Sequence, residues 1–228
     1  MCGRFTLSTN ADEIARELEV ELFEAEQKNL PSFNIAPTQM AAILVDGGQR
    51  RLKMMRWGLV PSWAKDETIG SRMINARSET LTEKPSFRNL IDKRRCLVVA
   101  NGYYEWQKTG GGKQPHYIQS ADNGLLLFAG LWDVRRPPGR EPLHSFTIIT
   151  TNAAPSLTDL HHRMPVVLDR GHASVWSDVD QCSKADAVTL LKPNDRGLAV
   201  HPVSTFVNSV RNNSPQCIEP IFSTDTLF

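Results

Sequence analysis

The sequence predicts a single domain built mainly of antiparallel β-strands, with a few short helices. In the middle of the chain, β-rich runs alternate with glycine-containing turns at 110–112 and 122–124, which is typical of an antiparallel meander. The chain contains no internal repeat, no proline- or serine-rich linker and no sharp change in composition. With 228 residues and 40% apolar composition, it is long enough to bury one substantial core.

The first elements are marked by capping and turn residues. Asn10 followed by Glu13 resembles a capping box, and Ile14 and Leu18 supply the apolar stripe of a short helix. The elements expected next are an ordered loop at 29–38, a hairpin with strands at 40–46 and 49–57 around a turn at 47–48, a helix at 85–95 and a strand at 96–100.

The second half of the chain continues with strands and two helical signals. Pro155 is expected to begin a helical turn, and Ser183 to cap a helix that continues to Leu191. Further strands are expected at 116–119, 125–132, 145–151, 166–168 and 198–203. The polar segment 212–228 is expected to be loose, so the domain is assigned to residues 1–220 and a tail to 221–228.

Charge and cysteine content exclude several classes of protein. Lys and Arg number 26 against 25 Asp and Glu, so any nucleic-acid site must be a local patch. The four cysteines, at 2, 96, 182 and 217, form no C-x-x-C pair, which argues against a zinc site and a disulfide framework. Cys96 lies in an apolar run and is expected to be an inert core thiol. Without a signal peptide or a long apolar stretch, a soluble intracellular protein is expected, with no metal or cofactor.

A thiol lies one residue from the N-terminus. Removal of Met1 would make Cys2 an N-terminal 1,2-aminothiol, whose amine has a pKa of about 7.7–8.0 and whose thiol has one of about 8.5. Such a pair reacts with aldehydes, because the amine forms a Schiff base and the thiolate then closes a thiazolidine ring. The alternative is that Cys2 is simply a small residue near the end of the chain.

Glu105 lies between aromatic residues at the end of an apolar run. Desolvation by Tyr104 and Trp106 would raise the pKa of the carboxyl group and suit it to general acid catalysis near neutral pH. A nearby cation would lower that pKa, and the sequence leaves open which effect is larger. A satisfied surface acid is the alternative.

Three loops carry further candidates. Trp57 and Trp63 flank a loop and are either core residues or a stacking surface for bases, with core favoured for Trp57. The segment 75–80 is either a solvated turn or a clamp for phosphate or carbonyl groups. The segment 161–165 combines two histidines with an arginine beside a proline, which favours function.

Six segments in this order resemble the SRAP (SOS response-associated peptidase) family of abasic-site processing proteins, from Cys2 to about residue 220. They are Cys2-Gly3-Arg4-Phe5, Asn34-Ile35-Ala36-Pro37, Trp57-Gly58-Leu59-Val60-Pro61, Asn75-Ala76-Arg77-Ser78-Glu79, Gly102-Tyr103-Tyr104-Glu105-Trp106 and His161-His162-Arg163-Met164-Pro165. Each motif is weak alone, but the set in this order is specific. The resemblance implies an α+β domain with a largely antiparallel, barrel-like sheet surrounded by helices.

The resemblance also implies a chemistry. Cys2, freed of Met1 by the protein itself, would attach covalently to the aldehyde of an abasic site in single-stranded DNA and shield it, with a β-lyase activity through the Schiff base. Asn75 would hold the Cys2 amine and a nearby phosphate, Glu105 would move protons, and His161 would assist at the sugar. The implied DNA contacts are Arg4, Arg77, Arg163, Pro37, Trp63 and Thr150.

The expected partner is therefore single-stranded DNA containing abasic sites, with no membrane and no obligate protein partner. We expect a cytoplasmic monomer that joins the nucleoid when bound to damaged DNA. Two rival functions remain open at this point. One is an N-terminal-nucleophile amidohydrolase based on Cys2. The other is a passive single-stranded-DNA reader that binds through Arg77, Arg163 and Trp63.

Overall fold

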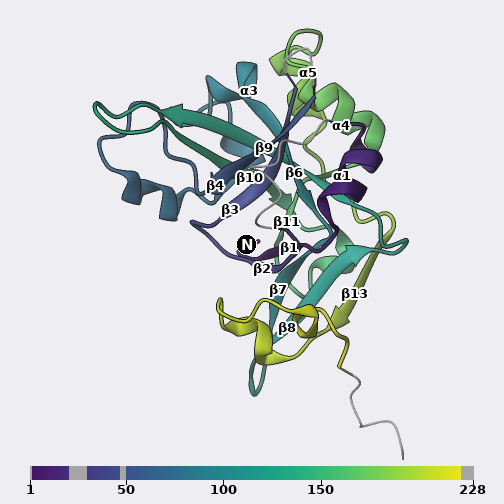
Figure 1. Ribbon diagram of the computed structural model, residues 1–228. Helices are drawn as coiled ribbons and strands as arrows, with labels where there is room; N and C mark the ends of the chain where they lie inside the picture. Colours follow the sequence, from purple (N-terminus) through teal and green to yellow (C-terminus); the bar gives the residue numbers. More distant parts are fainter. Residues whose placement is uncertain (1, 21–29, 47–49, 222–228) are drawn as a thin grey trace, which may run out of the picture.

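The computed structural model describes residues 2–20, 30–46 and 50–221. They form two β-sheets that share an apolar core, with short helices around the outside (Figure 1). The first sheet consists, in spatial order, of β13 (Leu198–Pro202), β8 (Gly112–Ser120), β7 (Gly102–Thr109), β1 (Phe5–Leu7) and β2 (Ser32–Ile35). All of its pairings are antiparallel.

The second sheet closes on itself. Its ring consists, in spatial order, of β10 (Leu143–Asn152), β4 (Arg51–Trp57), β3 (Met40–Val45), β6 (Arg95–Ala100) and β9 (Leu126–Arg135). Because β9 also pairs with β10, the five strands form a closed barrel, in which only the β10–β4 pairing is parallel. The predicted α+β domain with a largely antiparallel, barrel-like sheet is confirmed.

Three short strands extend the barrel at the end of β10. β5 (Asn75–Arg77) runs parallel to β10, and β11 (Arg163–Pro165) runs antiparallel to it. β12 (Val167–Leu168) pairs with β9. The segments 75–80 and 161–165, far apart in the sequence, therefore meet on the two sides of β10.

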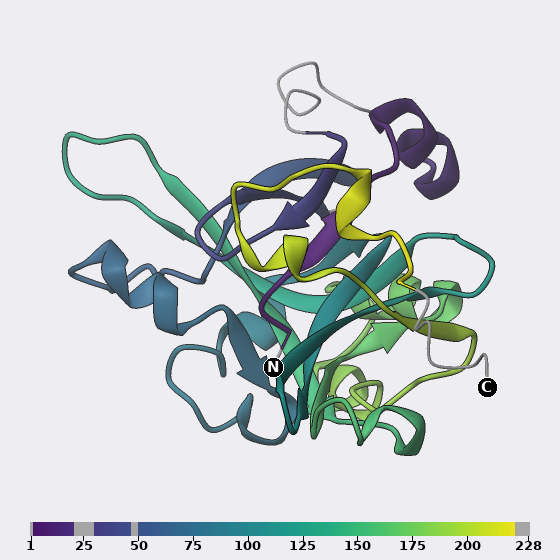
Figure 2. The same ribbon diagram turned by 90° about the horizontal axis from the view of Figure 1, so that it is seen from below.

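The helices are short and lie outside the sheets (Figures 1 and 2). They are α1 (Ala11–Leu18), α3 (Leu90–Lys93), α4 (Arg170–Ser177) and α5 (Lys184–Thr189), with 3₁₀ turns η1 (Glu67–Arg72), η2 (Ser78–Thr80), η3 (Pro155–Leu157), η4 (Thr205–Asn208) and η5 (Pro215–Cys217). The predicted caps are confirmed, because Asn10 accepts from the Glu13 amide and Ser183 accepts from the Asp186 amide. In the described ranges, no helix has the length and apolarity to cross a membrane.

Two local predictions are wrong. The helix expected at 85–95 is reduced to α3, because Arg95 already belongs to β6 and its side chain is buried. The loop expected at 29–38 contains the strand β2, which pairs with β1 across an irregular register. Pro31 and Pro37, on either side of this four-residue strand, gave the segment the composition of a loop. Residue 29 itself, like the turn expected at 47–48, lies outside the described residues.

The expected meander is divided between the two sheets. β7 and β8 pair as a hairpin, but β8 takes β13 as its other neighbour, while β9 crosses to the barrel. The turn at 122–124 is therefore a passage between sheets rather than a hairpin turn. Turn residues indicate where a strand ends, but they do not indicate which strand it pairs with.

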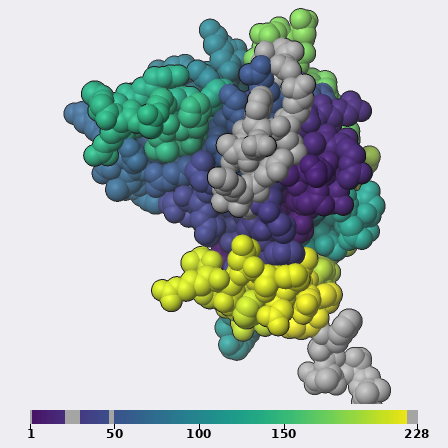
Figure 3. Space-filling view, viewed as in Figure 1, coloured from purple at the N-terminus to yellow at the C-terminus, as the bar shows by residue number. Residues whose placement is uncertain are grey.

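The segment 203–221 is ordered against the first sheet, contrary to the loose tail expected from residue 212. Val203, Val207 and Cys217 are fully buried and pack against Tyr104 and Tyr117. In Figure 3, the yellow atoms of this segment form a continuous layer along the lower face of the molecule. Residues 222–228, the rest of the expected tail, lie outside the described residues.

A buried arginine holds the barrel to the helices. Arg95 is 1% exposed and, in the described part of the chain, has no ion pair. Its guanidinium instead donates to four backbone carbonyls at 2.6–2.9 Å, those of Ile91, Trp176, Asp178 and Cys182. These carbonyls belong to α3, α4 and the segment after α4, so one side chain satisfies acceptors from three places.

We predict that Arg95→Met lowers the free energy of unfolding by about 3 kcal/mol, because four backbone carbonyls, all buried or partly buried, lose their donor. Urea unfolding of the variant and of wild type measures the difference. Arg140→Met, at an exposed arginine, is the control and should have an effect close to zero. Equal stability of Arg95→Met and wild type would contradict this role.

Candidate active site

Cys2 lies at the junction of the two sheets, just before β1, and is fully buried. Asn75 of β5 donates from Nδ2 to the Cys2 carbonyl at 2.8 Å. The Cys2 thiol lies 4.0 Å from the carbonyl oxygen of Arg4. The β5–β10 pairing, with Asn75 opposite Ile148, fixes Asn75 in place. The structure thus brings together two of the expected site residues.

Asn75 has a second polar atom available at this site. Its Oδ1 is buried and has no hydrogen-bond partner among the residues that the structure describes. Buried acceptors are normally satisfied, and an exception often marks a binding function. An N–H group beside the Cys2 backbone would satisfy it.

Glu105 lies on β7, opposite His116 of β8, and is 5% exposed. Burial raises the pKa of Glu105 to about 7, so its carboxyl group is close to half protonated at neutral pH. Burial also raises the pKa of the Cys2 thiol, and the nearby Glu105 charge raises it further. Desolvation therefore outweighs nearby positive charge at Glu105, which the sequence had left open.

The source of that desolvation differs from the expected one. Successive side chains of a strand point to opposite faces, so Tyr103 rather than Tyr104 or Trp106 shares the face of Glu105. Tyr104 instead packs against Tyr117 with ring centroids 5.1 Å apart. The pKa of Tyr103 is raised by burial and by the charges of Cys2 and Glu105, which places its phenol in the same site.

His161 precedes β11 and is held as a neutral ring. The Arg163 amide donates to its Nδ1 at 2.9 Å, and burial lowers the pKa of His161 to about 4. The ring stacks on His162 with centroids 4.2 Å apart. At neutral pH the remaining ring proton is therefore on Nε2, and His161 is a hydrogen-bond donor rather than a cation.

Arg163 and Thr150 are turned into the protein. The Arg163 guanidinium makes a two-pronged ion pair with Glu79 at 2.6 and 2.9 Å and donates to Asn152 and to the Thr150 carbonyl. Arg163 is 6% exposed and Thr150 is fully buried. A phosphate would have to displace Glu79 to reach this arginine.

Arg4 is also engaged internally. Its Nη1 donates to Asn34 Oδ1 at 2.6 Å and to the Val207 carbonyl at 2.9 Å, and its guanidinium carbon lies 5.8 Å from the Trp106 ring centroid. Asn34 donates in turn to the carbonyls of Val207, Ser209 and Asn212. Sequence reasoning quoted Asn34 within a motif but gave it no role.

Arg77 and Trp63, by contrast, reach the surface. Arg77 ends β5 and is exposed, and Trp63 is 61% exposed. The loop of Trp63 is braced by β9, because the Ser62 amide donates to Asp133 and Arg135 donates to the Ala64 carbonyl. Trp57 is fully buried and donates to the Ile74 carbonyl, which confirms it as a core residue.

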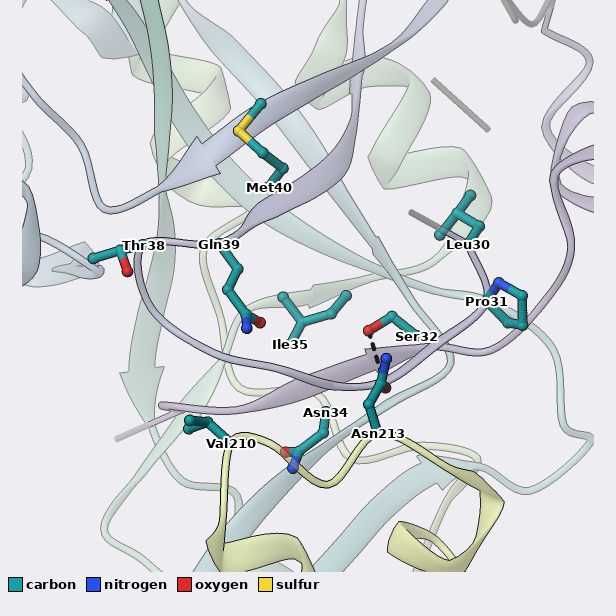
Figure 4. A pocket seen from close by; sticks show the side chains of 10 residues that line it. All are labelled: Leu30, Pro31, Ser32, Asn34, Ile35, Thr38, Gln39, Met40, Val210 and Asn213. Carbon is teal, nitrogen blue, oxygen red and sulfur yellow. Dashed lines mark hydrogen bonds between the residues drawn. The ribbon is translucent and has the colours of Figure 1, made fainter. Parts of the chain in front are cut away.

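The loop 36–39 lies between β2 and β3 and carries the half-buried Pro37. Two hydrogen bonds of 2.8 Å join it to Trp57, one from the Thr38 amide to the Trp57 carbonyl and one from the Trp57 amide to the Gln39 carbonyl. A cavity of about 540 Å³ opens beside this loop (Figure 4). Across the described ranges, no three His, Cys, Asp or Glu side chains gather as metal ligands would.

The chain is similar to known proteins over almost its whole length. A family model described as "SOS response associated peptidase (SRAP)" matches residues 1–210. The chain belongs to the SRAP family. Abasic site processing protein YoqW of Bacillus subtilis (strain 168) is a relative with 42% identity over 222 residues, covering 96% of this chain and 99% of YoqW.

Two further comparisons extend the likeness. Abasic site processing protein HMCES of Gallus gallus is 37% identical over 264 residues, covering 97% of this chain and 78% of HMCES. A crystal structure of a protein from Bacteroides thetaiotaomicron has a TM-score of 0.87 and 29% identity, covering 97% of this chain and all of that one.

The raised pKa of Glu105 predicts a pH-dependent stability. Between pH 4.5 and about 7, the unfolded chain releases the Glu105 proton while the folded protein retains it, so wild type loses stability as the pH rises. Glu105→Gln cannot ionise, and its stability relative to wild type should increase by about 3 kcal/mol across this window and then level off. Urea unfolding of both proteins between pH 4 and 8 measures the change.

Glu79 provides a control of opposite sign. Its pKa is lowered, first by the hydrogen bond from Arg163, so its contribution is present at neutral pH and lost as the pH falls. Glu79→Gln should therefore lose stability relative to wild type as the pH rises through the acid range. A pH-independent difference for Glu105→Gln would contradict the raised pKa.

Proposed function

We propose that this protein processes abasic sites in single-stranded DNA by a covalent crosslink through Cys2. Its relatives YoqW and HMCES are named abasic site processing proteins. The observation that carries the proposal is the burial of Cys2, whose carbonyl accepts from Asn75, within electrostatic reach of Glu105, a buried carboxyl group whose pKa is about 7. Aldehyde capture requires an amine, a thiol and a general acid, and removal of Met1 would supply the amine next to the Cys2 thiol and Glu105.

The first step is removal of Met1. Hydrolysis of the Met1–Cys2 peptide bond adds water, leaving a carboxylate on Met1 and a free amine on Cys2. Glu105, half ionised at neutral pH, takes a proton from the attacking nucleophile and returns it to the departing amine. The free acceptor Oδ1 of Asn75 then binds the new amine.

The crosslink follows in two bond-forming steps. The Cys2 amine adds to the aldehyde carbon of the ring-opened sugar, and the carbinolamine loses water after Glu105 protonates its hydroxyl group. The thiol then adds to the C=N bond and closes the five-membered ring. Because the buried thiol has a raised pKa, it attacks only as it gives its proton to Glu105.

His161 assists at the sugar in this scheme. As a neutral ring with its proton on Nε2, it donates a hydrogen bond to a sugar hydroxyl or to the ring oxygen as the ring opens. A Schiff base that forms without ring closure allows elimination of the 3′ phosphate, which is the proposed lyase activity.

The DNA is held by residues of two kinds. Arg77, Trp63 and Pro37 contact phosphates and bases directly, because Arg77 and Trp63 are exposed and Pro37 is half-buried in the loop between β2 and β3. Arg4 and Arg163 support that surface from inside, and Thr150 supports it from β10. Arg163 contacts a phosphate only when Glu79 moves away.

The crosslink is tested by replacing Cys2. Cys2→Ala should abolish the heat-stable adduct with abasic DNA on a denaturing gel while leaving single-stranded-DNA binding intact, because the DNA contacts are on other residues. Cys2→Ser should give only an adduct that requires borohydride trapping, because a hydroxyl group closes the ring far less readily than a thiol.

Intact mass and intact DNA provide the controls. Wild-type protein should lack the mass of Met1 and should form no adduct with DNA that has all its bases. A heat-stable adduct with Cys2→Ala would exclude the mechanism, whereas turnover of a small amide without DNA would favour the amidohydrolase.

Arg77 is tested through the salt dependence of binding. Arg77→Ala should weaken binding to every base sequence alike and reduce the slope of log affinity against log salt by about 0.7, the loss of one phosphate contact on a single strand. Arg16→Ala, at an exposed position of α1, removes the same charge elsewhere and should leave the slope unchanged. An unchanged slope with Arg77→Ala would put the DNA on another face.

A further inference from the structure

The cavity of about 540 Å³ beside the loop 36–39 has no role in the scheme above. Its floor is β2, and its walls are the turn 38–40 and the segment 210–213, which Figure 4 shows facing a common space. Its volume lies within the range of about 300–1,000 Å³ that is usual for small-molecule sites. Cys2 and Glu105 do not line it, so it is separate from the reacting groups.

Both walls of the cavity are fixed by hydrogen bonds. The turn is joined to Trp57 through the amide of Thr38 and the carbonyl of Gln39. The segment 210–213 is held by Asn34, which donates to the Asn212 carbonyl at 2.7 Å. The cavity is therefore formed before any ligand binds, and binding needs little ordering of the chain.

Two side-chain amides in the cavity have a fixed orientation. Gln39 Oε1 accepts from the Ala36 amide at 2.8 Å, and Asn213 Oδ1 accepts from the Phe33 amide at 2.6 Å. A backbone N–H can only donate, so in each side chain the oxygen faces inward and the NH₂ group is left over. Neither NH₂ group has an acceptor within residues 2–20, 30–46 and 50–221.

The rest of the lining is uncharged. Ile35, Met40 and Val210 provide apolar surface, and the described lining residues include no Lys, Arg, Asp or Glu. Met40 and Val210 are 44% and 49% exposed, so apolar side chains face the solvent here. A phosphate would find no cation in such a cavity. A flat neutral ring with acceptor atoms on its edge would find both apolar contact and two donors.

The loop 36–39 lies between the cavity and Cys2, and the distance between them is short. Phe5 pairs with Ile35 in antiparallel register, so the chain after Ile35 runs back alongside the residues before Phe5. Cys2 is three residues before Phe5, or about 10 Å along an extended chain. A strand of DNA bound at Cys2 therefore has a neighbouring nucleotide within reach of the cavity.

We propose that this cavity binds the base of a nucleotide next to the abasic site. The inference rests on the proposed function. An abasic sugar has lost its base, the group that proteins stack against and hydrogen-bond, so the neighbouring base supplies these contacts instead. Gln39 and Asn213 donate to carbonyl oxygens or ring nitrogens of the base, while Ile35, Met40 and Val210 pack against its faces. The neighbouring base thus aligns the aldehyde with Cys2.

The test uses single-stranded oligonucleotides with a central tetrahydrofuran, an abasic analogue that cannot form the crosslink. Neighbouring bases are removed one at a time by further tetrahydrofuran units, and affinity is measured by fluorescence anisotropy. Removing the bound base should weaken wild-type binding by about 5- to 100-fold, the usual contribution of one base. Removing bases farther away should have little effect.

The variant Gln39→Glu/Asn213→Asp keeps both inward-facing oxygens and replaces both NH₂ groups by acceptors. This variant should bind the oligonucleotide that has all its neighbouring bases no better than the oligonucleotide that lacks the base bound in the cavity. Gln181→Glu/Gln216→Glu adds the same charge at exposed positions outside the cavity and should retain the wild-type dependence. Thermal unfolding of all three proteins checks that they are folded.

Two results would overturn the proposal: no loss of wild-type affinity on removal of any single neighbouring base, or the same dependence in the cavity variant as in its charge control. Adduct formation with true abasic DNA is measured separately. If the heat-stable adduct forms and the base dependence is absent, the base site fails alone. If no adduct forms, the proposed function fails whatever the base dependence.

Discussion

The withdrawal of Cys2 and Glu105 from water is the constraint on which the site depends. Both residues lie where the first sheet meets the barrel, and burial favours the protonated form of each. A carboxyl group that shares its proton near pH 7 is both donor and acceptor, while a protonated thiol stays unreactive until a base is next to it. This arrangement orders the proposed chemistry, because the amine reacts first and the thiol second. It also protects the thiol from oxidation before DNA binds.

Most of the motif arginines stabilise the junction between the first sheet and the barrel rather than lie exposed on the surface. Arg4 and Arg163 satisfy carbonyl and carboxylate groups around the site, much as Arg95 satisfies carbonyls at the helices. Guanidinium groups suit this use because they present several donors in a fixed plane. Of the three motif arginines, Arg77 alone is exposed, which agrees with a chain whose net charge is only +1. In the proposed complex, a single strand that passes Arg77 and Trp63 would need few charged contacts, because a bound base would also hold it.

Local sequence signals predicted much of the fold but not its connections. Asn10, Pro155 and Ser183 marked helix starts correctly because capping is decided within a few residues. The division of the meander between two sheets depends on β13 pairing with β8, a contact across about 80 residues that leaves no local pattern. The site residues were predicted from the family resemblance. The resemblance did not predict that Arg163 points inward, because its ion pair with Glu79 forms only when β5 and β11 both pair with β10. Whether burial or nearby charge decides the pKa of Glu105 likewise depends on the three-dimensional structure and could not be predicted from the sequence.

The hydrogen bonds from Asn34 to the segment 207–212 affect when the site can form during synthesis of the chain. β1 and β2 belong to the first residues made, yet Asn34, Arg4 and β8 each have partners in β13 or in the segment after it, near the other end of the described chain. Such contacts between the two ends of a chain form late, because a ribosome must release most of the sequence before they exist. A nascent chain therefore has its cysteine but lacks the surroundings that tune it. In the proposed scheme, removal of Met1 by the protein itself, and with it reactivity toward aldehydes, would wait until synthesis is nearly finished, so an incomplete polypeptide would not become attached to DNA.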